Sequence, residues 1–198
     1  MTIEGNLLFG TSNAVYAVAS DGLPATSVNF TQGRFLDGDS FVRGPRDLIL
    51  LRNGELLVQD IGTTPQSLRR FRLTGENVLL GTFETDDMGT AFLDTSTAYG
   101  LTQLDDGRVV VLDYRVGRNP AVRFVVFEED GTYLRSIVPP DPTLRFDGIA
   151  PGPNGTFLVG ETTTRKILQY VPEMSTPVGE FATEVANVSA LTRANDGS

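Results

Sequence analysis

The sequence predicts an all-β protein built from four copies of a four-stranded unit. Three features carry the prediction: a glycine turn that recurs about every 50 residues, a short apolar run after each turn, and a polar residue that ends each run. The recurring glycines are Gly5, Gly54, Gly107, Gly155 and Gly197. Glycine between two apolar runs is a strong hairpin signal, because it adopts a positive φ at no steric cost. Units of this length with strand-sized runs are typical of β-propeller blades.

The strands of each unit follow in a fixed order. Second strands are expected at residues 7–9, 56–58, 109–111 and 157–159, where continuous apolar runs suit strands covered on both faces. Third strands are expected at 15–18, 68–71, 124–127 and 167–170, and fourth strands at 25–30, 77–83, 133–138 and 178–181. Aromatic residues recur at equivalent positions and are predicted to form the core between blades: Phe71, Phe83, Phe124, Phe127, Phe157, Tyr170 and Phe181.

The first strand of the first unit is expected from the other end of the chain. Residues 187–193 copy the opening strands of the later units and precede the turn at Gly197. We therefore expect a single β-propeller domain over residues 1–198, closed by the C-terminal strand. Its blades would be residues 188–198 plus 5–31, residues 44–83, residues 98–138 and residues 147–181.

Four blades per chain allow two arrangements. The chain closes on itself as a small ring, or two chains exchange terminal strands and form a ring of eight blades. The closed monomeric ring is favoured over the strand-swapped dimer, because a tethered strand has an effective concentration in the millimolar range, to order of magnitude.

Composition excludes several classes of function. The chain has no cysteine and no histidine, which excludes thiolate nucleophiles, cysteine- or histidine-bound zinc and imidazole-based catalysis within it. Its net charge of −9 argues against a nucleic-acid partner, whose phosphates demand clustered Lys and Arg. Neither a signal peptide nor a membrane-spanning run is recognisable, so we expect no membrane partner and a cytoplasmic protein or part of an assembly released from the cytoplasm.

Acidic residues are the candidate binding residues. Asp60, Asp113 and Glu161 end the second strands of three units, so they are expected on one face of the propeller. Their carboxylates suit a hard cation such as Ca²⁺, but Asp and Glu at such positions also cap loops by accepting backbone N–H bonds. Because these acids recur once per blade, the interpretation as loop caps is favoured over a cation site. No cofactor is predicted, and Ca²⁺ is the alternative.

Two further acids lie on the expected innermost strands. Asp47 and Asp147 open the first strands of their units, where side chains are expected to face the central channel. There they could supply oxygen ligands or a general base. They complete the set of candidate binding residues, and no catalytic residue is predicted.

The repeat resembles that of a known superfamily. The order glycine turn, apolar strand, acidic stop, loop and Arg/Lys-Ile-x-x-Phe/Tyr is similar to the NHL repeat and to SMP-30 and streptogramin-lyase-like propellers; residues 155–161 with 166–170 match best, and 107–113 with 123–127 closely. The resemblance implies a rigid propeller, usually of six or seven blades, whereas this chain encodes four. For SMP-30-like hydrolases it implies a metal near the channel, and for streptogramin-lyase-like enzymes a histidine base, which this chain lacks.

Two functional hypotheses follow. The first is a non-catalytic binding or structural module that has a protein partner or self-associates, as a component of a larger assembly such as a surface or virion structure. It rests on the absence of His and Cys and on the repetition of every conspicuous residue. The alternative is a metal-dependent SMP-30-like hydrolase or lactonase that uses carboxylates at the channel mouth.

Overall fold

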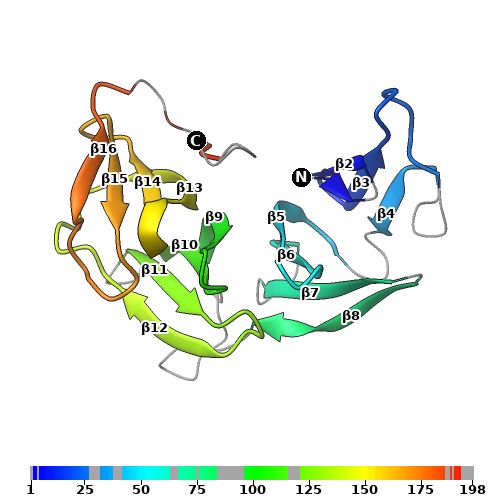
Figure 1. Cartoon of the computed structure of the whole chain (residues 1–198), viewed down its shortest axis with the longest axis horizontal. Coiled ribbons are helices and arrows are strands. Elements are labelled where there is room, and N and C mark those ends of the chain that lie inside the picture. Colours follow the sequence, from blue (N-terminus) through cyan, green and yellow to red (C-terminus); the bar gives the residue numbers. More distant parts are fainter. Residues whose placement is uncertain are drawn as a thin grey trace. The chain divides into compact units, whose positions relative to one another are not determined.

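Four antiparallel sheets of four strands each make up the computed structural model, which confirms the predicted all-β class and the number of sheets (Figure 1). The structure describes residues 2–3, 5–26, 32–37, 42–62, 67–74, 76–83, 96–115, 121–185, 188 and 190–192. The chain divides into two compact units, Met1–Glu84 and Thr85–Ser198. Each unit holds two sheets, which we call blades 1 and 2 and blades 3 and 4.

Neighbouring strands in each sheet are consecutive in the chain. Blade 1 consists of β1 (Thr2–Ile3), β2 (Asn6–Gly10), β3 (Ala14–Val18) and β4 (Arg34–Asp37), and blade 2 of β5 (Pro45–Leu50), β6 (Leu56–Asp60), β7 (Ser67–Thr74) and β8 (Glu76–Phe83). Blade 3 consists of β9 (Ser96–Gln103), β10 (Val109–Arg115), β11 (Val122–Phe127) and β12 (Tyr133–Ile137). Blade 4 consists of β13 (Phe146–Pro151), β14 (Phe157–Glu161), β15 (Lys166–Tyr170) and β16 (Gly179–Ala182), with the 3-10 helix η1 (Pro153–Gly155) between β13 and β14. Among the described residues, no helix is both long and apolar enough to cross a bilayer.

Gly5, Gly54, Gly107 and Gly155 close hairpins in the way that the sequence predicts, and Gly197 lies outside the described residues. Gly54 and Gly107 have φ angles of +83° and +97°, which residues with a Cβ rarely adopt. The preceding Asn53 accepts a hydrogen bond at its Oδ1 from the backbone N–H of Glu55, at 2.9 Å. This is the Asx turn that makes Asn-Gly and Asp-Gly effective between antiparallel strands.

The innermost strand of blade 1 differs from the prediction. Thr2 and Ile3 pair with Leu7 and Asn6, so β1 occupies the position that was assigned to residues 188–198. Of those C-terminal residues the structure describes 188 and 190–192, and none of these four belongs to a strand. β1 is close to β2 in the sequence, so their pairing costs far less loop-closure entropy than pairing β2 with a segment near residue 188.

The outermost strand of blade 1 also differs. It was expected at residues 25–30 and lies at 34–37, beyond the expected end of the blade at residue 31. Within the described part of this segment, the Asp21-Gly22 turn is followed by an isolated bridge between Val18 and Pro24. Residues 27–30 of the expected strand lie outside the described residues.

Each unit has an apolar core between its two blades. In unit 2 the described core contains the buried aromatic residues Phe124, Phe146, Phe157 and Tyr170, and the Phe124 ring lies 5.1 Å from those of Phe157 and Tyr170. Five of the seven predicted core aromatics are fully buried: Phe71, Phe124, Phe127, Phe157 and Tyr170. Phe181 is 58% exposed, contrary to the prediction, because β16 has a bulge at this residue: Ile167 pairs with Ala182 and Leu168 with Glu180. The side chain of Phe83 lies outside the described residues.

Candidate functional site

Asp60, Asp113 and Glu161, the acids predicted to end second strands, lie at or near the ends of those strands and are buried. Asp60 ends β6, Glu161 ends β14, and Asp113 lies near the end of β10. All three side chains are fully buried. A buried carboxylate must be compensated by hydrogen bonds or by a cation, so the partners of each acid decide what it does.

Asp60 holds together the loops on both sides of its blade. Its Oδ1 accepts hydrogen bonds from the backbone N–H groups of Gly44 at 3.0 Å and Gly62 at 3.1 Å, and its Oδ2 accepts one from Arg43 at 3.1 Å. The Arg69 guanidinium lies 3.4 Å from Oδ2. The carboxylate therefore caps the segment that enters β5 and the turn that leaves β6.

Glu161 does the same in blade 4. Its Oε1 accepts the backbone N–H of Thr163 at 2.7 Å, and its Oε2 accepts the backbone N–H of Thr164 at 2.6 Å and the Thr164 hydroxyl. Burial alone would raise the pKa of this carboxyl, but the hydrogen bonds from Thr164 and Thr163 outweigh it and hold the pKa below its ordinary value. The charged form of Glu161 is therefore the form that the fold stabilises.

The lowered pKa of Glu161 predicts a pH-dependent contribution to stability. Because the folded-state pKa lies below the ordinary 4.5, this contribution is complete above that value and is lost as pH falls through the folded-state pKa. Glu161→Gln should lower the free energy of unfolding by about 1–3 kcal/mol at neutral pH. Urea titrations of both proteins should show that difference shrinking at acid pH, and a constant difference would contradict the assignment.

Asp113 is compensated by a basic side chain. Its Oδ2 lies 2.7 Å from Nε of Arg123, whose side chain is only 4% exposed. Arg123 also donates to the Ser136 hydroxyl at 3.1 Å, so one guanidinium joins β10, β11 and β12. The pair is a buried ion pair inside one sheet.

Asp47 and Asp147 lie on the first strands of blades 2 and 4, as predicted. Both are half-buried and both adjoin a bulge in their strand, between Pro45 and Asp47 and between Asp147 and Ile149. Asp47 Oδ1 lies 2.8 Å from the backbone N of Leu48. Asp47 belongs to unit 1 and Asp147 to unit 2.

The described residues contain no group of three acids that could hold a metal ion. The contacts of Asp60 and Glu161 favour the interpretation of these acids as loop caps, since each already accepts three or more hydrogen bonds. The binding role assigned to the five acids stays a prediction.

An exposed apolar face of blade 1 is a surface that the sequence analysis missed. Leu7 and Phe9 on β2 pair with Val18 and Tyr16 on β3, so the four side chains share one face of the sheet. Leu7 is 51% and Phe9 41% exposed, and the Phe9 and Tyr16 rings stack at 5.9 Å. We call this the front face of blade 1, and the face carrying Leu8, Val15 and Ala17 its back face.

The equivalent front faces of blades 2 and 4 are covered. In blade 2 the positions of Leu7, Phe9 and Val18 correspond to Leu56, Val58 and Phe71, all fully buried against the back face of blade 1. In blade 4 the corresponding positions pack against blade 3: Phe157, Val159 and Tyr170. The sequence held no signal for this difference, because residues 7–9 form a continuous apolar run like the equivalent residues of the other blades.

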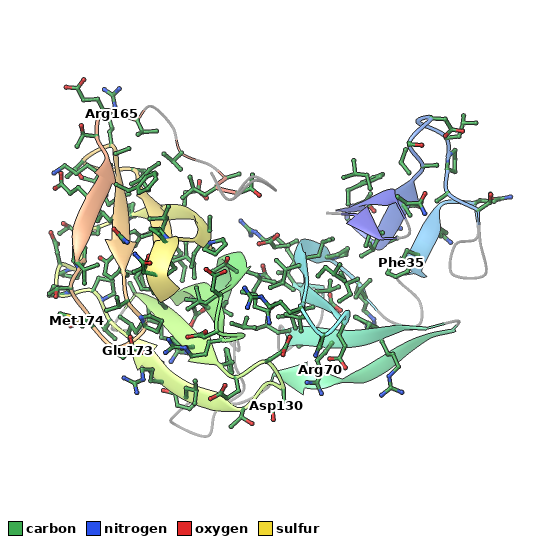
Figure 2. All side chains as sticks on the ribbon, in the orientation of Figure 1. Phe35, Arg70, Asp130, Arg165, Glu173 and Met174 are labelled. Atoms are coloured by element: carbon green, nitrogen blue, oxygen red, sulfur yellow. The ribbon has the colours of Figure 1, made fainter. Side chains whose placement is uncertain are left out.

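An ion pair and a hydrogen bond also connect blade 3 with blade 4. The Arg108 guanidinium, in the turn before β10, pairs with Glu173, in the turn after β15, at 2.5 Å. Figure 2 labels Glu173 beside Met174 in that turn. Tyr114 connects the same blades by donating its hydroxyl to the Phe146 carbonyl at 2.9 Å.

No protein-family model and no curated protein matches the chain, but solved β-propeller structures do. Virginiamycin B lyase from Staphylococcus aureus has a TM-score of 0.64 at 14% identity, over 100% of this chain and 59% of the lyase chain. A chain in a nidogen/laminin complex has a TM-score of 0.62 at 14% identity, over 95% of this chain and 64% of that one. A luciferin-regenerating enzyme has a TM-score of 0.61 at 12% identity, over 95% and 62%.

These likenesses confirm, at the level of the fold, the resemblance to streptogramin-lyase-like propellers. The chain spans less than two thirds of the length of each of these three structures. A catalytically inactive histidine-to-alanine variant of the same lyase, crystallised with quinupristin, has a TM-score of 0.52 at 12% identity.

Proposed function

We propose that this chain is a non-catalytic β-propeller module that binds a protein partner. The observation that carries the proposal is the front face of blade 1, where Leu7, Phe9, Tyr16 and Val18 form a partly exposed apolar surface on a sheet. The same face is buried in blades 2 and 4. An apolar sheet face of this kind gains free energy when another protein surface removes it from water.

The chemistry of the chain supports a binding role over lyase activity. A histidine-to-alanine change inactivates virginiamycin B lyase, and this chain contains no histidine. The buried acids hold loops and a guanidinium in place, which is a structural task. One neighbour, the chain from the nidogen/laminin complex, comes from a structure of a protein–protein complex.

The alternative is a metal-dependent hydrolase of the SMP-30-like kind. The likeness to a luciferin-regenerating enzyme favours it, as do two half-buried acids on first strands, Asp47 and Asp147. This alternative requires a cation held by oxygen ligands, and so it predicts stoichiometric Ca²⁺ binding.

Calcium titration decides between the two functions. We expect calorimetry of the chelator-treated chain to show no saturable heat with Ca²⁺ up to about millimolar concentrations, the range of weak extracellular sites. Asp147→Asn should then behave as the wild type does. A one-to-one site that is lost in Asp147→Asn, together with chelator-sensitive hydrolysis of a lactone, would overturn the non-catalytic proposal.

A further inference from the structure

We propose that Asn154 is a site of spontaneous covalent modification, at which the side-chain amide is lost and an aspartyl or isoaspartyl residue forms. Asn154 is exposed and is followed by Gly155, in the turn between β13 and β14. Because glycine has no Cβ, its backbone nitrogen can approach a neighbouring carbonyl carbon closely. The inference concerns the β13–β14 turn alone and does not depend on the proposed binding role.

Four other turns of the same sequence type are each held by two hydrogen bonds. In each, the glycine N–H donates to the carbonyl three residues earlier, at 2.9–3.1 Å. In each, Oδ1 of the preceding Asp or Asn accepts the N–H of the residue after the glycine, also at 2.9–3.1 Å. The glycine nitrogen and the side-chain carbonyl are therefore both held in place. The four turns are Asp21-Gly22, Asn53-Gly54, Asp106-Gly107 and Asp130-Gly131.

The Asn154 turn is built differently. The N–H of Thr156 donates to the Pro153 carbonyl at 3.2 Å, so the N–H that binds Oδ1 in the other turns is already used. Asn154 has a φ of +56° and Gly155 one of +74°, both in the left-handed region. Within the part of the chain that the structure describes, the Asn154 carboxamide has no hydrogen-bond partner. Its Cγ is therefore free to turn toward the Gly155 nitrogen.

The reaction at this turn requires only water. The Gly155 N–H gives its proton to solvent, and the nitrogen attacks Cγ of Asn154 and forms a bond to it. The bond from Cγ to the side-chain nitrogen breaks, this nitrogen takes up a proton and leaves as ammonia, and a cyclic succinimide remains. Water then opens the ring at Cγ, which gives an aspartyl residue, or at the main-chain carbonyl carbon, which gives an isoaspartyl residue. No oxidant or reductant takes part.

Either product changes the hairpin that follows. Both carry a carboxylate where the Asn154 side chain is neutral, and the isoaspartyl product also adds a carbon to the main chain of the turn. β14 begins soon afterwards at Phe157, whose fully buried ring stacks on Tyr170. A longer turn disturbs the placement of that ring in a closely packed core. We therefore expect the isoaspartyl form to unfold at a lower urea concentration than the unmodified chain.

The test compares the two Asn-Gly turns of the full chain during storage. The folded protein is kept in mildly alkaline buffer, digested in acid and mapped by mass spectrometry, with aspartyl and isoaspartyl peptides separated by chromatography. Asn154 should lose its amide at least several-fold faster than Asn53, whose Oδ1 and following glycine N–H are both hydrogen-bonded. Faster loss at Asn53, or loss at neither position, would overturn the proposal.

The unfolded chain tests whether the turn is the cause. In concentrated urea the hydrogen bonds at Asn53 are lost, so the two sites should lose their amides at similar rates. A difference that persists unchanged in urea would place its cause in the flanking residues, and the structural argument would be wrong.

Two variants test the assignment by a second measurement, the release of ammonia. Asn154→Gln should lower the release several-fold, because glutamine must close a larger ring. Asn53→Asp keeps the Oδ1 acceptor of its turn and should leave the release unchanged. If Asn53→Asp lowers ammonia release and Asn154→Gln does not, the modified residue is Asn53 and the proposal is wrong.

Discussion

Asp60→Ala should lower the free energy of unfolding by about 3–5 kcal/mol, because one buried and three partly buried donors lose this acceptor together. The backbone N–H groups of Gly44, Gly62 and Arg43 lose their acceptor, and Arg69 loses a carboxylate at 3.4 Å. Urea unfolding followed by far-UV circular dichroism should show the loss as a lower transition midpoint.

An exposed aspartate provides the control for this variant. Asp141 accepts hydrogen bonds from the backbone N–H of Thr143 at 2.8 Å and from its hydroxyl at 2.6 Å. Water can replace that acceptor in Asp141→Ala, so this variant should change stability far less than Asp60→Ala. Equal losses in the two variants would mean that burial of the Asp60 carboxylate is unimportant.

Arg123→Met should lower the free energy of unfolding by about 3–5 kcal/mol, because it leaves the buried Asp113 carboxylate without its cation. Arg123 lies 2.7 Å from Asp113 and also donates to Ser136. The double variant Asp113→Leu/Arg123→Met removes both charges and should be more stable than the single variant. A thermodynamic cycle over the four proteins measures the coupling between the two side chains.

The same substitution at a surface pair separates burial from charge. Arg108 lies between Asp106 and Glu173 with its side chain 22% exposed. Because exposed ion pairs contribute little, Arg108→Met should cost less than about 1 kcal/mol. A loss at Arg108 as large as that at Arg123 would show that the charge itself, and not its burial, determines the cost.

The roles of the acidic residues were only half predictable. Their recurrence identified Asp60, Asp113 and Glu161 as equivalent positions and favoured caps over a cation site. It did not reveal that Asp113 pairs with Arg123, because these two residues meet only through the register of β10 with β11, which places them opposite each other. The sequence also did not predict that the front face of blade 1 is exposed, because the apolar run at residues 7–9 is typical of a strand covered on both faces.

The sequence by itself determined the four sheets, because glycine turns and apolar runs act over a few residues and recur. The second and third strands and the positive φ at the turn glycines follow from that local pattern. The tertiary structure decided which segment completes blade 1, since Thr2–Ile3 and residues 187–193 both suit an inner strand and only competition for the edge of β2 selects between them. It also decided which apolar faces are covered, because burial depends on the neighbouring sheet and not on the strand's own residues.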